Sequence, residues 1–327
     1  MSVVYFKDDS EIEHEVQLNK SESVLDGLLR VGHKVPHSCK SGVCQSCIMT
    51  AKSSVIPKDS QRGLRNSQKQ QGHFLSCCCV PQKPLVISLT GQYIREECTV
   101  LNKAFIAPDV VRLRINKVID YRSGQYVTLW KDNETARSYS IASHPGQDDF
   151  IEFHIRIYPD GVFSSWLVDE LVVGARLAVQ GPIGNCFYAL EDNLKPIFLS
   201  GLGTGLAPLY GIARDALLSG HKGEVLVLVG AKLESGLYYQ EEFADLQRLY
   251  PQLKVHYSVQ KITPGVATTN HYETDIYNTA KTLIPSFAGV SVFLCGNVSF
   301  VKKMRKQCFL SGANMADIYS DSFLSFS

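Results

Sequence analysis

The sequence has no long hydrophobic run and almost no net charge. Its 33 basic and 32 acidic side chains leave a formal charge of +1, which gives no reason to expect nucleic acid or a membrane surface as the main partner. Apolar runs such as Val225–Val229 are far too short to cross a bilayer. The first residues turn acidic at Asp8 and Asp9 before an apolar core forms, so we expect no signal peptide. A cytoplasmic protein is expected.

Cysteine is the residue type that stands out against this background. The chain has ten cysteines, and without an export signal we interpret them as metal ligands and reduced thiols, because disulfides are rare inside cells. At 327 residues, the chain is also too long for one ordinary domain. Two or three domains are therefore expected.

Three cysteines, Cys39, Cys44 and Cys47, lie within nine residues, and Cys77 follows after 29 intervening residues. This C-x4-C-x2-C spacing with a distant fourth thiol is that of a plant-type [2Fe–2S] loop, in which four thiolates converge on two irons. Gly42 suits a loop that folds back on itself. A structural zinc site is the alternative, but zinc ligands usually come in two paired clips. We therefore predict that these four cysteines bind a [2Fe–2S] cluster.

Residues 1–92 are predicted to form a domain around this loop. The expected elements are a hairpin, a helix capped by Ser21 or Ser23, and two later strands, at Val3–Phe6, Glu13–Leu18, Ile48–Ala51 and Leu85–Leu89. Their order resembles plant-type ferredoxins, which implies a β-grasp fold. In ferredoxins the last ligand stands in a Leu-x-Cys-Gln segment, which Leu75-Ser-Cys77-Cys78 matches. The resemblance favours Cys77, while Cys78 and Cys79 stay open as alternatives.

Residues 98–191 are predicted to form an antiparallel β-barrel. Short β-rich runs follow one another closely, at Thr99–Phe105, Val110–Ile115, Gln125–Trp130, Tyr139–Ala142 and Phe150–Ile157. Short strands at this density are typical of a barrel. After them, Ser164 is expected to open a helix whose N-terminus can bind a pyrophosphate, although an ordinary capped helix is the alternative.

Residues 195–327 change to alternating strands and helices. The expected elements are a buried strand, a glycine-rich turn, a helix and an apolar strand, at Pro196–Ser200, 201–208, Leu209–Leu218 and Val225–Val229. Such runs indicate a parallel sheet covered on both faces. Ligands of these sheets bind at the carboxyl ends of the strands, where the glycine-rich turn lies. The turn is not the G-x-G-x-x-G fingerprint, so it is weak evidence by itself.

Two motifs in the second segment, Arg137-Ser-Tyr139-Ser140 and then Gly161-Val-Phe-Ser164, resemble those of the ferredoxin-NADP reductase superfamily. The resemblance implies that Arg137 binds flavin phosphate and that Tyr139 packs on the isoalloxazine. Ser140 is then expected to hydrogen-bond near flavin N5. Gly161, Ser164 and the neighbouring amides would bind the pyrophosphate.

The same resemblance assigns further contacts to the flavin. His154 and Arg156 occupy the family's next flavin strand, with Arg156 in the place of its usual basic residue. A turn at Gly181-Pro-Ile-Gly184 also matches the family. Because relatives with a ferredoxin at the front use FAD, we expect FAD and not FMN.

The glycine-rich turn matches the G-x-G-x-[AT]-P turn of that superfamily, which implies that Gly203, Thr204 and Gly205 bind a nicotinamide nucleotide. Cys295-Gly296 stands where relatives carry Cys-Gly-Pro. The resemblance implies that Cys295 lies beside nicotinamide C4 with Gly296 next to it. A buried strand cysteine without such a role is the alternative.

Many relatives end with an acidic residue and an aromatic residue that covers the flavin. Phe323 is the best match, and Phe326 competes with it. Ser140, Cys295 and Phe323 are therefore expected beside the reacting atoms. A basic and an acidic residue, Lys232 and Glu234, follow the strand that ends at Val229, so NADH and NADPH both stay open.

The order ferredoxin, flavin, nicotinamide covers essentially the whole chain and resembles the reductase components of bacterial multicomponent oxygenases. This resemblance implies that NADH electrons pass through FAD and a [2Fe–2S] cluster, one at a time, to an oxygenase or its ferredoxin. A flavin is the necessary intermediary because it takes two electrons and releases them singly. Two alternatives stay open: a reductase for a deoxysugar-forming iron–sulfur dehydratase, and a non-catalytic nucleotide-binding scaffold with a zinc module.

Overall fold

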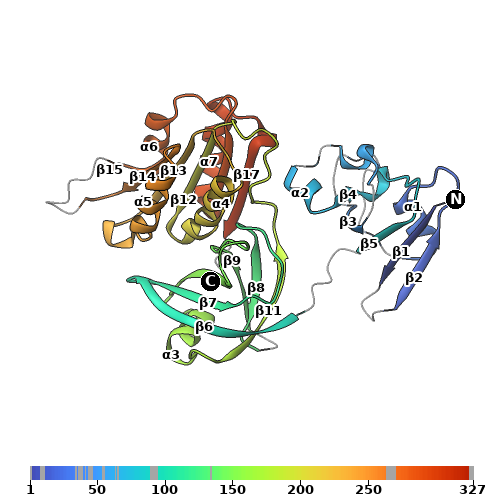
Figure 1. The fold of residues 1–327 in the computed structure, drawn as a ribbon, viewed down its shortest axis with the longest axis horizontal. Helices are drawn as coiled ribbons and strands as arrows, with labels where there is room; N and C mark the ends of the chain where they lie inside the picture. Colours follow the sequence, from blue (N-terminus) through green and yellow to red (C-terminus); the bar gives the residue numbers. More distant parts are fainter. Residues whose placement is uncertain are drawn as a thin grey trace. The chain divides into compact units, whose positions relative to one another are not determined.

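The computed structural model describes residues 2–7, 12–33, 35, 40, 42, 47–53, 56–62, 64, 66–88, 95–132, 135–262 and 270–323. The chain divides into two compact units, Met1–Tyr93 and Ile94–Ser327. Figure 1 labels most of the helices and strands of each unit. Three residues named in the site predictions, Cys39, Cys44 and Phe326, lie outside the described residues.

The first unit is built on a five-stranded sheet in the order β2-β1-β5-β3-β4. Its strands are β1 (Val3–Lys7), β2 (Glu13–Gln17), β3 (Ile48–Ser53), β4 (His73–Leu75) and β5 (Leu85–Ser88). The β1–β5 pair is parallel and the other three pairs are antiparallel. This mixed sheet with one packed helix confirms the predicted β-grasp ferredoxin fold.

Helix α1 (Val24–Arg30) covers the sheet of this unit and buries Val24, Leu25 and Leu28 in its core. Of the two serines expected to cap it, Ser23 is the N-cap, and its hydroxyl accepts a hydrogen bond from the backbone N–H of Asp26. A short helix, α2 (Asn66–Gln70), and two 3-10 turns, η1 (Lys58–Gln61) and η2 (Ser76–Cys78), complete the unit.

The second unit begins with a six-stranded antiparallel sheet in the order β10-β7-β6-β11-β8-β9. The strands are β6 (Arg95–Ala107), β7 (Val110–Asn116), β8 (Tyr126–Trp130), β9 (Ala136–Ser140), β10 (Phe150–Arg156) and β11 (Arg176–Ile183). A bridge between Phe153 of β10 and Ile141, the residue after β9, joins the two edges of the sheet. The sheet is therefore closed into the predicted barrel.

Two local predictions for this barrel are wrong. The segment Gly181-Pro-Ile is not a turn, because it lies inside β11, whose pairing with β8 shifts register between Gln180 and Ile183. Helix α3 (Val162–Asp169) begins before Ser164, with Gly161 as its N-cap. Ser164 is therefore a first-turn residue of the helix and does not open it.

The rest of the second unit is a parallel sheet in the order β15-β14-β13-β12-β16-β17. The strands are β12 (Ile197–Leu202), β13 (Val225–Ala231), β14 (Leu253–Val259), β15 (His271–Glu273), β16 (Ser291–Asn297) and β17 (Ile318–Phe323). The chain adds β13, β14 and β15 on one side of β12 and then places β16 and β17 on the other. The order thus reverses at β12 and β16, which is where such sheets bind ligands.

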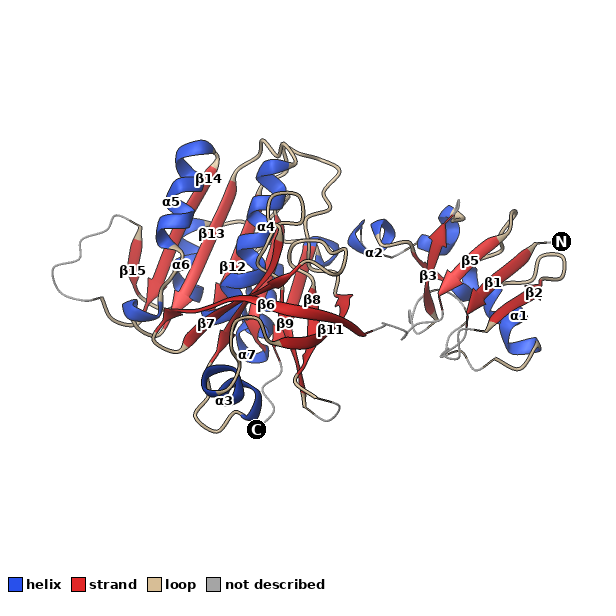
Figure 2. Ribbon diagram, turned by 60° about the horizontal axis from the view of Figure 1, so that its bottom comes forward, coloured by secondary structure: helices blue, strands red, loops and turns tan. Residues whose placement is uncertain are grey.

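Helices cover both faces of this parallel sheet (Figures 1 and 2). The helices α4 (Leu206–Leu218) and α5 (Gln240–Leu249) share one core, and α6 (Ile276–Leu283) and α7 (Val298–Leu310) share the other. The prediction that the first helix begins at Leu209 is wrong by one turn, because a proline such as Pro208 fits the first turn of a helix. None of the described helices is long and apolar enough to span a membrane.

Candidate functional site

Two of the predicted cluster ligands lie side by side in the first unit. The sulfur atoms of Cys47 and Cys77 are 3.2 Å apart. Ser76 holds the two segments together, because its backbone N–H and its hydroxyl both donate to the carbonyl of Cys47, at 3.1 and 2.7 Å. A tetrahedral metal that binds thiolates at about 2.3 Å holds them roughly 3.7 Å apart. The two sulfur atoms could therefore bind the same metal ion once they move slightly apart.

The neighbouring cysteines differ in where their thiols lie. The sulfur of Cys78 is 3.6 Å from that of Cys77, and a Cβ added to Gly42 would come within 2.8 Å of it. Cys79 is fully buried in the core of the unit, beside Ser60, and burial raises the pKa of its thiol to about 12. Cys77 as the fourth ligand, with Cys78 and Cys79 as alternatives, stays a prediction.

Three residues of the predicted flavin site lie on β9. The ring of Tyr139 packs against Phe163 of α3, with centroids 5.5 Å apart, and burial raises its pKa above the ordinary range. Arg137 is half-buried two residues earlier. At the end of the strand, the hydroxyl of Ser140 donates to a carboxylate oxygen of Asp321 at 2.7 Å.

Asp321 is a site residue that the sequence motifs did not assign. It lies on β17 of the parallel sheet, and burial raises its pKa while the Ser140 hydrogen bond opposes that rise. The only signal in the sequence is an acidic residue two positions before Phe323. The pairing itself depends on how β17 packs against the barrel. Phe323, the last residue of β17, is half-buried and pairs in register with Asn297.

The N-terminus of α3 supplies the predicted pyrophosphate site. The hydroxyl of Ser164 bonds to the carbonyls of Tyr158 and Gly161, at 3.3 and 3.1 Å, and accepts from the N–H of Tyr158 at 3.2 Å. Its bonds are thus satisfied within the chain. What the helix still offers to a phosphate is the backbone N–H groups of its first turn, residues 162–164.

The glycine-rich turn lies at the point where the strand order reverses. It forms a 3-10 turn, Gly203–Gly205, and Gly203 has the left-handed φ of +58°. A Cβ on Gly205 would stand 2.0 Å from the carbonyl oxygen of Cys295 on β16. Only glycine fits this contact. The backbone thus forms a cradle that fits a dinucleotide phosphate.

Arg156 reaches this turn from the barrel. A Cβ on Gly203 would lie 3.0 Å from its guanidinium nitrogen, and the same group pairs with Asp109 at 3.3 Å. About a third of the Arg156 side chain remains exposed. A cation from the barrel is therefore placed beside the predicted nucleotide turn of the other domain.

Cys295 and Gly296 end β16 beside that turn. Cys295 is fully buried, and its sulfur lies 3.8 Å from that of Cys186, which follows β11 of the barrel. Burial raises the pKa of Cys295 well above its ordinary value. Gly296 has a φ of +148°. A place for Cys295 beside the nicotinamide stays a prediction, because its thiol here contacts another thiol.

His154 is the predicted flavin residue with the least access to a cofactor. Its side chain is fully buried and its Nε2 lies 3.1 Å from Glu152. Its ring stands against Tyr238 and Tyr239 of the parallel-sheet domain. The Nε2 atom is therefore occupied within the chain, whereas Nδ1 is buried without a hydrogen-bond partner among the described residues.

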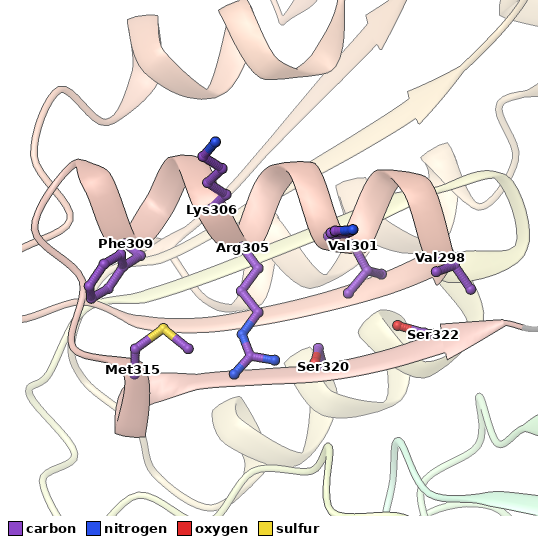
Figure 3. Close-up of a pocket in the computed structure, with 9 residues that line it drawn as sticks. Val298, Val301, Arg305, Lys306, Phe309, Met315, Ser320 and Ser322 are labelled. Carbon is purple, nitrogen blue, oxygen red and sulfur yellow. The ribbon is translucent and has the colours of Figure 1, made fainter.

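A groove of about 490 Å³ lies between α7 and β17 and holds none of the predicted site residues (Figure 3). Lys302, Arg305 and Lys306 line it together with Ser320 and Ser322. Side chains alternate along a strand, so these serines lie on the face of β17 opposite Asp321. The groove is thus separated by the sheet from the Ser140–Asp321 pair.

Comparison with known families gives three consecutive matches. Residues 6–82 match the 2Fe-2S iron-sulfur cluster binding domain, residues 97–188 the oxidoreductase FAD-binding domain, and residues 198–306 the oxidoreductase NAD-binding domain. They confirm the three predicted cofactors and, with the three sheets, the predicted fold class. The domain limits at residues 92, 98, 191 and 195 stay predictions.

Individual relatives match nearly end to end. The chain is 32% identical over 305 residues to the reductase subunit of an aromatic O-demethylase of Amycolatopsis, covering 88% of this chain and 89% of that one. It is 26% identical over 315 residues to a CDP-6-deoxy-L-threo-D-glycero-4-hexulose-3-dehydrase reductase of Yersinia pestis, covering 93% and 94%. The crystal structure of an Amycolatopsis cytochrome P450 reductase aligns with a TM-score of 0.67 at 27% identity, covering 99% of both chains.

Proposed function

The chain belongs to the family of iron–sulfur flavoprotein reductase components of oxygenase systems, and we propose that it passes electrons from NADH through FAD and a [2Fe–2S] cluster, singly, to an oxygenase or its ferredoxin. It is an NAD(P)H-dependent oxidoreductase. The observation that best supports the proposed route is the junction of barrel and parallel sheet. There Ser140 meets Asp321, and Arg156 meets the Gly203 turn.

The proposed chemistry divides among the three cofactors. A bound flavin takes two electrons from a reduced nicotinamide and gives them up one at a time, which suits a one-electron iron–sulfur acceptor. Arg137 and the free amides of α3 would hold the flavin phosphates. The Gly203–Gly205 turn would hold the nucleotide phosphates, and Arg156, predicted from the sequence as a flavin residue, lies close enough to this turn to assist it. The cysteines Cys39, Cys44, Cys47 and Cys77 would hold the cluster.

Ser140 and Asp321 would handle a proton at the flavin. The hydroxyl of Ser140 stands at the end of β9 and donates to Asp321, so it can pass a proton between a neighbouring acceptor and this carboxyl. The raised pKa of Asp321 favours its protonated form more than in an exposed aspartate. Tyr139 would exclude water from the ring face by packing there.

Cys47→Ser tests whether electrons reach one-electron acceptors through the cluster, while the flavin alone oxidises NADH. We expect the variant to lose the cluster absorbance and the reduction of cytochrome c, a one-electron acceptor, because only the cluster route is cut. NADH oxidation with ferricyanide should survive, since it needs only flavin. Equal loss of both activities, or loss of neither, would contradict the proposal.

A second candidate keeps the chemistry but changes the acceptor. The relative from Yersinia pestis is named as a deoxysugar dehydrase reductase, so an iron–sulfur dehydratase is the competing partner. Stimulation of NADH consumption by an added oxygenase with its aromatic substrate, or by an added dehydratase with its sugar nucleotide, decides between them. The non-catalytic zinc scaffold is not kept, because the barrel and the parallel sheet match oxidoreductase families.

The remaining finer points are also proposals. NADH as the preferred nucleotide rests on resemblance to oxygenase reductases. Glu234 would favour NADH, whereas Lys232 would favour NADPH. A cytoplasmic location is supported by the free cysteines, eight among the described residues.

A further inference from the structure

Strand β10 of the barrel contacts the nicotinamide domain with three alternate side chains. Glu152, His154 and Arg156 lie on one face of the strand because successive side chains alternate. Glu152 accepts a hydrogen bond from the hydroxyl of Tyr239 at 2.5 Å. The ring of His154 lies 4.6 Å from that of Tyr239, and Arg156 lies at the Gly203 turn. One face of one strand therefore connects the two domains.

Glu152 is the centre of this contact. Its side chain is 4% exposed, and it bonds to Arg114 Nε at 2.6 Å and to His154 Nε2 at 3.1 Å as well as to Tyr239. Burial alone would raise the pKa of this carboxyl, but the three partners together lower it to about 2. An ionised buried carboxylate needs its partners. Of the three, only Tyr239 comes from the nicotinamide domain.

Tyr239 has an unfavourable backbone conformation at this contact. Its φ of 61° and ψ of 26° lie in the left-handed region, which residues with a Cβ avoid and which persists only where surrounding contacts hold it. Those contacts include the Glu152 hydrogen bond, an interaction of the hydroxyl with Arg112, and ring packing against His154 and Tyr210, at 4.6 and 5.0 Å. The barrel thus helps to fix the backbone of the other domain.

The segment that Tyr239 ends is placed to meet a nucleotide. Residues 232–239 leave the carboxyl end of β13, which pairs with β12 next to the Gly203 turn, and ligands of such sheets bind at that edge. Tyr239 itself is only 7% exposed. Any effect it has on a nucleotide must therefore act through the segment it holds.

We propose that the Glu152–Tyr239 hydrogen bond positions residues 232–239 for binding of the nicotinamide nucleotide, with Tyr239 as a positioning residue. The inference rests on the proposed function, which supplies the nucleotide. If the segment leaves its place in most molecules, the apparent dissociation constant rises by the inverse of the fraction that stays competent. The bond therefore sets nucleotide affinity and leaves the flavin and cluster unaffected.

Tyr239→Phe tests this by removing one hydroxyl, and Tyr210→Phe is the matched control. Tyr210 belongs to the same ring cluster, and among the described contacts its hydroxyl makes no hydrogen bond. In the full FAD-loaded chain, Tyr239→Phe should raise the dissociation constant for NAD⁺, measured by calorimetry, and the KM for NADH about tenfold, as for a competent fraction of about one tenth. The kcat with ferricyanide and the FAD content should stay within about twofold, and Tyr210→Phe should match the wild type.

A double-mutant cycle with Glu152→Gln tests whether Glu152 and Tyr239 act through the same hydrogen bond. If the two side chains act through one bond, the second substitution adds little to the rise in the dissociation constant caused by the first. Equal affinities in Tyr239→Phe and Tyr210→Phe would overturn the inference, and so would independent effects of the two substitutions. A wild-type chain that binds NAD⁺ but does not oxidise NADH would refute the proposed function alone.

Discussion

Glu152 is a buried, ionised carboxylate, and its contribution to stability should depend on pH. Its pKa falls from about 4.5 in the unfolded chain to about 2 in the folded one, so the ionised form is favoured by folding. The shift adds on the order of 3 kcal/mol above pH 4.5, and this contribution disappears as the pH falls from about 4.5 to 2.

Glu152→Gln should therefore lower the free energy of unfolding at pH 7 by a similar amount, measured by urea denaturation, and flatten its fall below pH 4.5. Asp149→Asn is the control, because Asp149 is an exposed acid nearby and surface changes rarely exceed about 0.5 kcal/mol. Parallel acid profiles of Glu152→Gln and the wild type would refute the assignment of this shift.

At the scale of residues, a local motif makes a site predictable, whereas partners from distant strands leave no pattern in the sequence. The spacing of Cys39, Cys44 and Cys47 predicts an iron–sulfur cofactor, which the family match confirms, while the ligands themselves stay predictions. By contrast, Ser140 and Asp321 are 181 positions apart, and no pattern in either segment names the other. Glu152 and Tyr239 escape notice for the same reason. These pairs exist only because the barrel and the parallel sheet pack together.

At the scale of elements, the 3-10 turn Gly203–Gly205 is the part most sensitive to a single atom. Gly205→Ala would place a Cβ 2.0 Å from the carbonyl oxygen of Cys295, so β16 or the turn must move. We expect a loss of roughly 1–3 kcal/mol in the free energy of unfolding together with weaker NADH binding.

The matched control for this substitution is Gly236→Ala. A Cβ there meets only the Cβ of Ala231, at an ordinary 3.6 Å, so stability should change by no more than about 0.5 kcal/mol. Thermal denaturation of both variants measures the effect on stability, for which Gly236→Ala is the control, and the KM for NADH is compared between Gly205→Ala and the wild type. Equal stability of the two variants would show that the turn tolerates a side chain.

The hydrophobic periodicity of the sequence predicts which helices and strands exist, but it does not predict the residues at which they begin and end. The apolar run Val225–Val229 predicts a buried parallel strand, and β13 contains it. Helix α4 begins at Leu206 and not at Leu209, because proline within a sequence ends a helical pattern although it is allowed in a first turn. Likewise, the glycine and proline at the register shift in β11 are residues that the sequence alone cannot distinguish from those of a turn.

At the scale of the whole molecule, the chain separates its one-electron centre from its two-electron centres. The two predicted cluster ligands among the described residues, Cys47 and Cys77, belong to the unit Met1–Tyr93, whereas the predicted flavin and nucleotide sites share the unit Ile94–Ser327. Composition and motif order predict this arrangement, because each domain has its own local signature. The acceptor has no such signature, since no motif describes the partner's surface.

Anaerobic titration of the purified chain with NADH, followed by visible absorbance and by electron paramagnetic resonance, tests the central claim most directly. One FAD and one [2Fe–2S] cluster hold about three electrons, so about 1.5 equivalents of NADH should bleach the flavin and produce the signal of a reduced cluster. A flavin that bleaches while the cluster stays oxidised, or a chain with no such cluster, would contradict the account.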